Sequence, residues 1–271
     1  MNLFELSEED FLRRLEDDMA ITGDLGELFP RMVAYNVPYF VLSQYWPEER
    51  ANLFKDPLFL AFCVAEAGWK GRLENLKGSL DLSSGRLTCE KTYVMQCDVM
   101  YILVWAGEDL ALCRVPRNPS QIWTSRQEDT VRFVSKTGAV RDHFIVSVDQ
   151  ILKSEGYVTL RKRNYVRAGM TIPRREMTGL AIVALGYMRF LKEDVSDLIG
   201  LRDEVLQARA TGELGAEAVH AASQIFHQLL RILPPDAHKI STLLWQHQSA
   251  NHRLLIQSSR AENQASLLLP S

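Results

Sequence analysis

The sequence predicts an α+β protein with a helical N-terminal region, a small central antiparallel sheet and a helical C-terminal bundle. Three observations lead to this prediction. Apolar residues recur at helical spacing up to about residue 80, alternate between about residues 81 and 170, and return to helical spacing beyond. The expected domains are therefore a helical acidic region, 1–80, a β-rich basic region, 81–170, and a helical region that could mediate oligomerisation, 171–271.

Four helices are expected in the N-terminal region. The first begins near Ser7, which is followed by three acidic residues, because a serine cap and acids in the first turn stabilise a helix start. The second covers 24–35. A short third helix begins at Pro47, since proline suits the first helical position, and a longer fourth covers 56–78.

Strand-forming residues dominate after Gly85. The runs 87–105 and 110–115 flank turn residues at 106–109 and predict a β-hairpin. A second hairpin is expected over 156–166. Together these segments make up the small sheet.

The remainder of the chain is predicted to be helical. The expected helices are 172–191, 193–210, 216–233 and 236–262. In the last of them, His247 and Asn251 lie inside an apolar stripe. This pattern indicates either packing against the preceding helix or self-association.

The net charge of −3 conceals an uneven distribution. Residues 1–60 contain twelve acidic and five basic residues, and residues 114–176 contain thirteen basic and six acidic residues. The two regions therefore carry opposite charge, which could pair within one molecule or between copies.

The cysteines indicate an intracellular protein, in the cytoplasm or the nucleus. They are Cys63, Cys89, Cys97 and Cys113. They show no CxxC spacing and are too few for a disulfide scaffold, so we expect buried, reduced thiols. No apolar run reaches the roughly 18–20 residues of a membrane span, so no transmembrane segment is expected.

A basic stretch is the main functional candidate, because the chain from Tyr157 to Arg175 carries six positive charges and no negative one. The basic residues are Arg161, Lys162, Arg163, Arg167, Arg174 and Arg175, with Tyr157 and Tyr165 among them. Lysine and arginine contact phosphates and tyrosine can stack on bases, so these eight residues form the expected nucleic-acid-binding site. The alternatives are a solvated hairpin, a patch that pairs with the acidic N-terminal region, and an anionic membrane surface.

Residues 126–169 resemble, in their order of elements, a winged helix-turn-helix. The resemblance depends on residues 151–158, ILKSEGYV, which are similar to the passage from recognition helix to wing in winged-helix regulators. It implies helices over 127–135 and 147–156 and a wing over 157–167. The alternative is a mixed sheet crossed by one helix, 148–154.

No catalytic or metal signature accompanies these features. His220 and His227 are seven residues apart, too far to share one metal ion on a helix, so neither a metal nor another cofactor is expected. Cys97, Asp98 and His143 all lie in the β-rich centre and could form an enzyme site. No nucleotide-binding glycine loop or nucleophile elbow is present.

These observations favour a non-enzymatic protein that binds RNA or DNA and assembles with copies of itself, as a nucleocapsid-like, matrix-like or regulatory protein would. Two alternatives remain. One is a structural or adaptor subunit that binds an acidic protein or an anionic membrane surface. The other is an enzyme with an unrecognised site in the central sheet.

Overall fold

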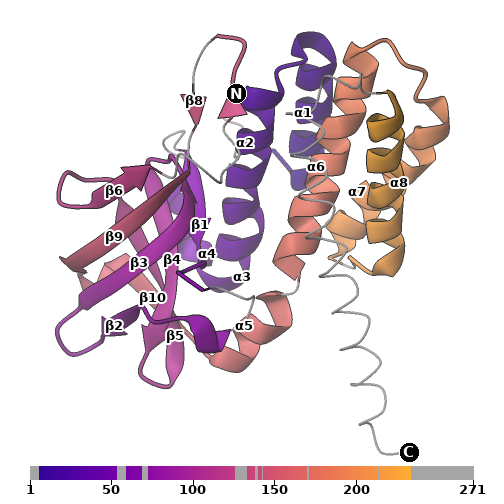
Figure 1. Cartoon of the computed structure of the whole chain (residues 1–271). Coiled ribbons are helices and arrows are strands. Elements are labelled where there is room, and N and C mark those ends of the chain that lie inside the picture. Colours follow the sequence, from indigo (N-terminus) through magenta and orange to yellow (C-terminus); the bar gives the residue numbers. More distant parts are fainter. Residues whose placement is uncertain are drawn as a thin grey trace, which may run out of the picture. The chain divides into compact units, whose positions relative to one another are not determined.

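The computed structural model describes residues 6–53, 59–68, 73–125, 133–137, 140–141, 143–169, 171–212 and 214–232 (Figure 1). The chain forms two compact units. The β unit comprises Met1–Ser7 and Asp24–Arg167, and the helical unit comprises Glu8–Gly23 and Ala168–Ser271. A central sheet combined with helices confirms the predicted α+β class, while the three proposed domains stay a prediction.

One sheet of eight strands makes up most of the β unit. The strands are β1 (Leu60–Cys63), β2 (Ser79–Asp81), β3 (Arg86–Met95), β4 (Val99–Ala106), β5 (Asp109–Pro116), β6 (Ile122–Ser125), β9 (His143–Ile151) and β10 (Tyr157–Leu160). Their order is β10-β5-β4-β2-β3-β9-β6, and β1 pairs with β4. The pairing is antiparallel except where β1 and β2 each lie parallel to β4. A separate two-stranded sheet joins β7 (Phe133–Val134) to β8 (Val140–Arg141).

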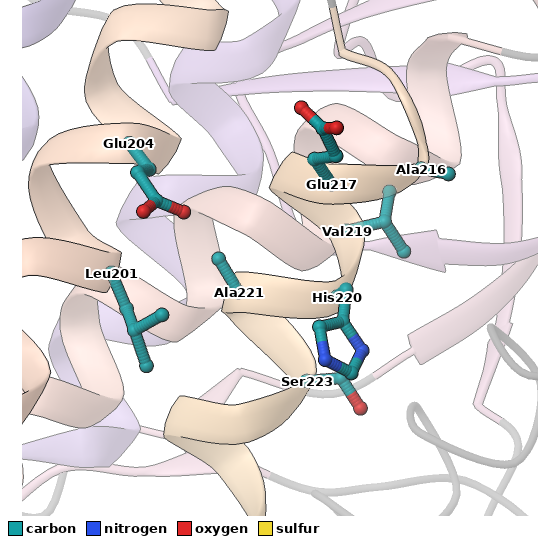
Figure 2. Close-up of a pocket in the computed structure, with 8 residues that line it drawn as sticks. All are labelled: Leu201, Glu204, Ala216, Glu217, Val219, His220, Ala221 and Ser223. Carbon is teal, nitrogen blue, oxygen red and sulfur yellow. The ribbon is translucent and has the colours of Figure 1, made fainter.

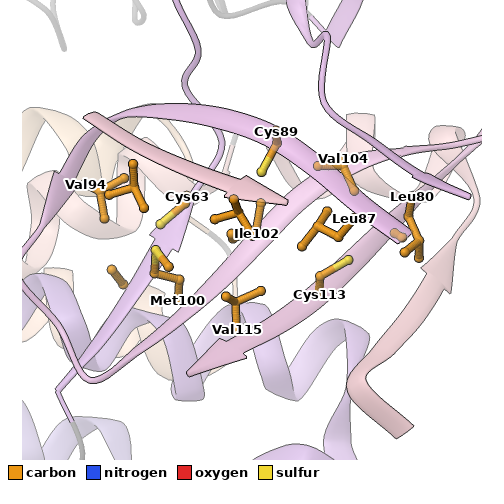
Figure 3. Packing of buried hydrophobic residues seen from close by; sticks show 14 of the residues in the cluster. Cys63, Leu80, Leu87, Cys89, Val94, Met100, Ile102, Val104, Cys113 and Val115 are labelled. Atoms are coloured by element: carbon orange, nitrogen blue, oxygen red, sulfur yellow. The ribbon is translucent and has the colours of Figure 1, made fainter. Parts of the chain in front are cut away.

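The core of the β unit is built by side chains that alternate along these strands (Figure 3). Leu87 and Cys89 in β3 point inward and pack with Ile102 and Val104 in β4 and with Val115 in β5. All but one of the residues in β4 are buried, so this strand reads as a continuous apolar run. Burial of these side chains supplies the main driving force for folding of the unit.

Short helices accompany the sheet in the β unit. They are α2 (Leu25–Asn36), the π-helix η2 (Val37–Leu42), α3 (Ser43–Tyr45), α4 (Pro47–Leu53), the 3₁₀ helices η3 (Leu73–Asn75) and η4 (Ser154–Gly156), and α5 (Lys162–Gly169). Glu49 in α4 is buried, accepts a hydrogen bond from the Tyr101 hydroxyl at 2.8 Å and pairs with Arg114 at 2.7 Å. This contact ties α4 to β4 and β5.

The helical unit contains α1 (Glu8–Thr22), α6 (Thr171–Phe190), the 3₁₀ helix η5 (Ser196–Leu198), α7 (Ile199–Thr211) and α8 (Ala216–Ile232). Helix α1 runs beside α6 (Figure 1). Gly186 permits this close approach, because a Cβ there would lie 2.3 Å from the Glu16 carbonyl oxygen. Glu8 of α1 pairs with two buried arginines, Arg175 of α6 and Arg209 of α7.

Several predicted elements are confirmed. The first two helices and the one that begins at Pro47 correspond to α1, α2 and α4. The predicted hairpin is formed by β4 and β5, where Ala106 faces Asp109 and Gly107 adopts a φ of 66° in the turn. The helices expected over 172–191, 193–210 and 216–233 correspond to α6, α7 and α8. The helix predicted over 236–262 lies outside the described residues.

Three predicted elements are wrong, in each case because strand pairing outweighs the local pattern. In place of the long helix predicted over 56–78, the chain forms β1, which pairs with β4. Residues 56–58 and 69–72 of that prediction lie outside the described residues. The helix at 148–154, and with it the winged-helix resemblance, is replaced by β9, which pairs with β3 and β6. The second hairpin is replaced by β10, which pairs with β5 and leads into α5. With eight strands, the sheet is also larger than expected.

Within the described part of the chain, none of the helices combines the length and the apolar character that a membrane crossing requires.

Candidate functional site

A β-bulge in β3 is the most unusual feature of the sheet. Lys91 faces Val146 of β9 and Val94 faces Phe144, so Thr92 and Tyr93 together oppose a single residue of the partner strand. Bulges re-aim side chains and occur beside active sites.

Tyr93 adopts a left-handed conformation within this bulge. Its φ is 59°, which is rare for a residue other than glycine and costs about 1–3 kcal/mol. Its side chain is nevertheless 55% exposed, so burial of the ring contributes little to offset that cost. Strain held at an exposed aromatic residue indicates a functional role, and we take the bulge as the candidate site.

A buried ion pair lies directly next to the bulge. Lys91 Nζ is 2.6 Å from Glu66 Oε1, and the two side chains are 0% and 4% exposed. Lys91 also donates to the Leu103 carbonyl at 2.7 Å and to the Val64 carbonyl at 3.2 Å. Each charged group therefore has an oppositely charged partner although it is shielded from water.

Thr92 connects this ion pair to the bulge. Its N–H donates to the Ala65 carbonyl at 2.8 Å. Its side-chain Oγ1 is buried and makes no hydrogen bond. A buried hydroxyl without a partner costs about 1–3 kcal/mol and calls for an explanation, and it lies next to the strained tyrosine.

The enzyme site considered from the sequence, formed by Cys97, Asp98 and His143, does not hold an active nucleophile. The Cys97 thiol is 3% exposed, and burial, followed by the nearby Asp98 charge, raises its pKa to about 12. A thiolate is therefore absent near neutral pH. Asp98 accepts a hydrogen bond from the Phe59 N–H at 2.7 Å, and His143 pairs with Met95 at the start of β9.

The residues of the predicted basic site differ in burial and belong to different elements. Arg161, Lys162 and Arg163 are exposed at the start of α5, where Lys162 Nζ lies 5.3 Å from the centre of the Trp105 ring. Tyr165, by contrast, is buried beside Tyr45, with ring centres 6.2 Å apart, and burial raises its pKa.

The remaining members of the basic stretch belong to three elements, β10, α5 and α6. Tyr157 lies in β10, where it packs half-buried against the apolar core. Arg167 lies in α5, and its side chain is outside the described residues. Arg174 and Arg175 belong to the helical unit, where Arg174 donates to the Leu214 carbonyl at 2.9 Å and Arg175 pairs with Glu8.

A pocket of about 680 Å³ lies between α7 and α8 in the helical unit. Figure 2 shows Glu204 on α7 and Glu217, His220 and Ser223 on α8 around it. His220 Nε2 lies 2.9 Å from the Gln224 side-chain nitrogen. No three His, Cys, Asp or Glu residues come together as a metal site in the described ranges. The pocket shows none of the strain found at the bulge, so it is the weaker candidate.

Comparisons with known proteins define the class of fold. Neither a protein-family model nor a curated protein sequence matches the chain. The structure is similar to butyryl-CoA dehydrogenase from Megasphaera elsdenii, with a TM-score of 0.66 and 13% identity over 93% of this chain and 80% of that chain. It is also similar to acyl-CoA dehydrogenase from Geobacillus kaustophilus, with a TM-score of 0.54 and 11% identity over 86% of this chain and 81% of that chain. It is similar as well to a structure of PigA with FAD and proline, with a TM-score of 0.56 and 12% identity over 89% of this chain and 78% of that chain. Identities this low show the fold alone, which is that of the acyl-CoA dehydrogenases.

The prediction of a non-enzymatic nucleic-acid-binding protein is wrong, while self-assembly stays a prediction. Solved structures that share this fold are named as dehydrogenases or as complexes with FAD, and these names include no nucleic acid. The physical reason for the error is the placement of the basic stretch, whose residues are divided between two units and partly buried. The alternative of an enzyme with a site in the central sheet fits the fold better.

Proposed function

We propose that the chain is a flavin-dependent dehydrogenase in which the bulge of β3 contacts the flavin ring. The fold supports an enzyme of this class, since structures that share it are named as dehydrogenases or as complexes with FAD. The observation that carries the proposal is Tyr93, an exposed aromatic residue held in a strained backbone conformation.

The residues at the bulge fit a flavin. The isoalloxazine ring is planar and aromatic, so it can stack on the exposed face of Tyr93, and aromatic pairs contribute about 0.5–1.5 kcal/mol beyond the burial of their area. The bulge interrupts the regular pairing of β3 with β9 between Lys91 and Val94, and such interruptions re-aim side chains. A bound flavin supplies hydride transfer.

The protein's own part in such chemistry is to bind and to orient. Tyr93 covers one face of the ring and keeps water from it. The positive charge of Lys91 and the negative charge of Glu66 cancel, so the buried ion pair next to the bulge adds no net charge to the site. Two of the similar structures are named as a butyryl-CoA and an acyl-CoA dehydrogenase, and a third is named with FAD and proline, so dehydrogenation is the activity proposed.

The location proposed for the enzyme is intracellular. All four cysteines are free and buried, which supports the compartment expected from their spacing.

The test is FAD binding by the purified protein, measured as the quenching of flavin fluorescence. We compare Tyr93→Gly with Tyr93→Phe. Glycine removes the ring and relieves the left-handed strain, so this variant should be at least as stable as the original protein and yet bind FAD roughly 2- to 12-fold more weakly. Phenylalanine keeps the ring and should bind normally.

The matched control is Ile122→Ala in β6, which removes another exposed apolar side chain, 66% exposed, from the same sheet. It should leave FAD affinity unchanged. If the original protein binds no FAD, or if Tyr93→Gly binds as well as Tyr93→Phe, the proposal is wrong. Bleaching of the bound flavin by butyryl-CoA or by proline then separates the two substrate classes.

A further inference from the structure

We infer that the buried Lys91–Glu66 ion pair positions Tyr93, by holding the segment Val64–Glu66 against β3 and so fixing the bulge. The inference rests on the proposed function, because it assigns a role to residues that lie behind the flavin-binding face. Neither Lys91 nor Glu66 is exposed enough to touch a ligand. They act through Tyr93 and are positioning residues.

The contacts between β3 and the segment form a continuous series. The Val64 carbonyl accepts a hydrogen bond from Lys91 Nζ, and the Glu66 carboxylate pairs with the same nitrogen. Between them, the Ala65 carbonyl accepts the Thr92 N–H. Three consecutive residues of the segment are thus bonded to the two residues that precede Tyr93.

The same ion pair also reaches two further parts of the sheet. Lys91 Nζ donates to the Leu103 carbonyl in β4. The Glu66 carboxylate accepts the Gly78 N–H at 3.1 Å, just before β2. A Cβ on Gly78 would lie 2.8 Å from Glu66 Oε1 and 2.5 Å from the Cys89 Cβ, so only glycine leaves room for this approach. The pair therefore fixes the bulge relative to β4 and to the start of β2.

Stability alone does not account for a pair of this kind. Removing two charges from water has a large cost, and replacing both partners of a buried pair with neutral residues is often neutral or stabilising. What the pair provides is a set of directed hydrogen bonds. A residue held in a sparsely populated conformation needs surroundings that determine it, and these bonds supply them for Tyr93.

The experiment removes both charges and keeps the acceptor that the backbone needs. In the double variant Lys91→Met/Glu66→Gln, the glutamine carboxamide can still accept the Gly78 N–H. Two quantities are measured: amide hydrogen exchange of residues 92–94 in the protein without added FAD, and the affinity for FAD. We expect exchange at the bulge to accelerate at least roughly fivefold and FAD affinity to fall by a similar factor, with little change in the midpoint of global unfolding.

The matched control is Arg86→Met/Asp149→Asn. Arg86 and Asp149 pair at 2.8 Å across the same two strands, β3 and β9, but their side chains are 63% and 54% exposed. Loss of this exposed pair should change neither the exchange of residues 92–94 nor the FAD affinity. If the double variant at the buried pair does not fold, Glu66→Gln alone decides the question, because Lys91 keeps its carbonyl partners in that variant.

The outcomes separate the inference from the proposed function. Unchanged exchange at residues 92–94 in a folded variant overturns the positioning role, whatever happens to FAD. Accelerated exchange in a protein that never binds FAD keeps the structural role of the pair and overturns the proposed function. Accelerated exchange with FAD affinity unchanged shows that the pair does not act on the ligand, and this too overturns the inference.

Discussion

A single methyl group at Gly186 should destabilise the helical unit. Alanine is the better helix former by about 1 kcal/mol, so the substitution would stabilise α6 in isolation. A Cβ at this position, however, would lie 2.3 Å from the Glu16 carbonyl oxygen and 2.9 Å from the Met19 Cβ of α1. Both atoms are part of the backbone or attached directly to it, so no side-chain rotation relieves the overlap, and α1 must move away from α6 by roughly 1 Å. Overpacking of this kind costs about 1–3 kcal/mol, so a net loss of up to about 2 kcal/mol is expected for Gly186→Ala.

The matched control is Gly200→Ala in α7. A Cβ at Gly200 has no heavy atom within 4 Å, so only the helix-propensity gain remains, and the variant should be more stable by up to about 1 kcal/mol. Urea unfolding followed by far-UV circular dichroism gives both values, and the two variants should differ by about 2 kcal/mol. If Gly186→Ala stabilises the protein as much as Gly200→Ala does, the close approach of α1 and α6 is not as the structure has it.

Three further predictions concern buried polar groups. Lys91→Met alone should lower the free energy of unfolding by about 3–5 kcal/mol, because it leaves the Glu66 carboxylate buried without its counter-charge. The double variant with Glu66→Gln should recover most of that loss. Additive losses of the two single variants in urea unfolding would contradict this. Tyr101→Phe should cost about 1–3 kcal/mol, since it removes a buried hydrogen bond to the Glu49 carboxylate, and an unchanged unfolding midpoint would show that the bond contributes nothing. The core thiols should make the protein less stable in alkali. Burial raises the pKa of Cys97 from 9.0 to about 12, so above pH 9.0 the unfolded chain loses a proton that the folded chain keeps. Stability should therefore fall as pH rises through this range, by up to about 1.4 kcal/mol per pH unit for each such thiol, and a flat profile of urea midpoints against pH would refute it.

The sequence predicted the elements whose stability is local. Helices α1 and α6 follow from periodic apolar residues and from their start signals, and the β4–β5 hairpin follows from a turn that only nearby residues need to satisfy. The elements that failed depend on distant partners. Residues 60–63 have an apolar pattern suited to either structure, and their parallel pairing with β4 decides for a strand. Residues 148–151 become a strand because β3 lies beside them.

The candidate site was missed, although the sequence held a signal for it. In β3, Leu87 and Cys89 alternate inward, and Lys91 occupies the next inward position, so a charge falls where an apolar residue is expected. Such a residue requires a buried partner. The alternation then slips by one residue, so that Thr92 is buried and Tyr93 is exposed, which is the mark of a bulge. Which carboxylate would pair with Lys91 could not be predicted, because Glu66 meets it only through the parallel pairing of β1 with β4.

The basic stretch shows the opposite error, in which neighbours in sequence were treated as neighbours in space. Arg175 lies only eight residues after Arg167, yet it turns inward in α6 and neutralises Glu8 from the N-terminal helix. A run of like charges describes a surface only when one element presents all of it to solvent.

The helical unit is discontinuous in sequence, and this has a consequence for synthesis of the chain. Glu8 contacts Arg209 across a separation of 201 residues, and α1 is complete roughly 150 residues before α6 begins. At about 5–20 residues per second, the apolar face of α1 waits on the order of 10–30 s for the helix that covers it. Helix α1 is thus made long before its native contacts can form, and no contiguous fragment of the chain contains the helical unit alone.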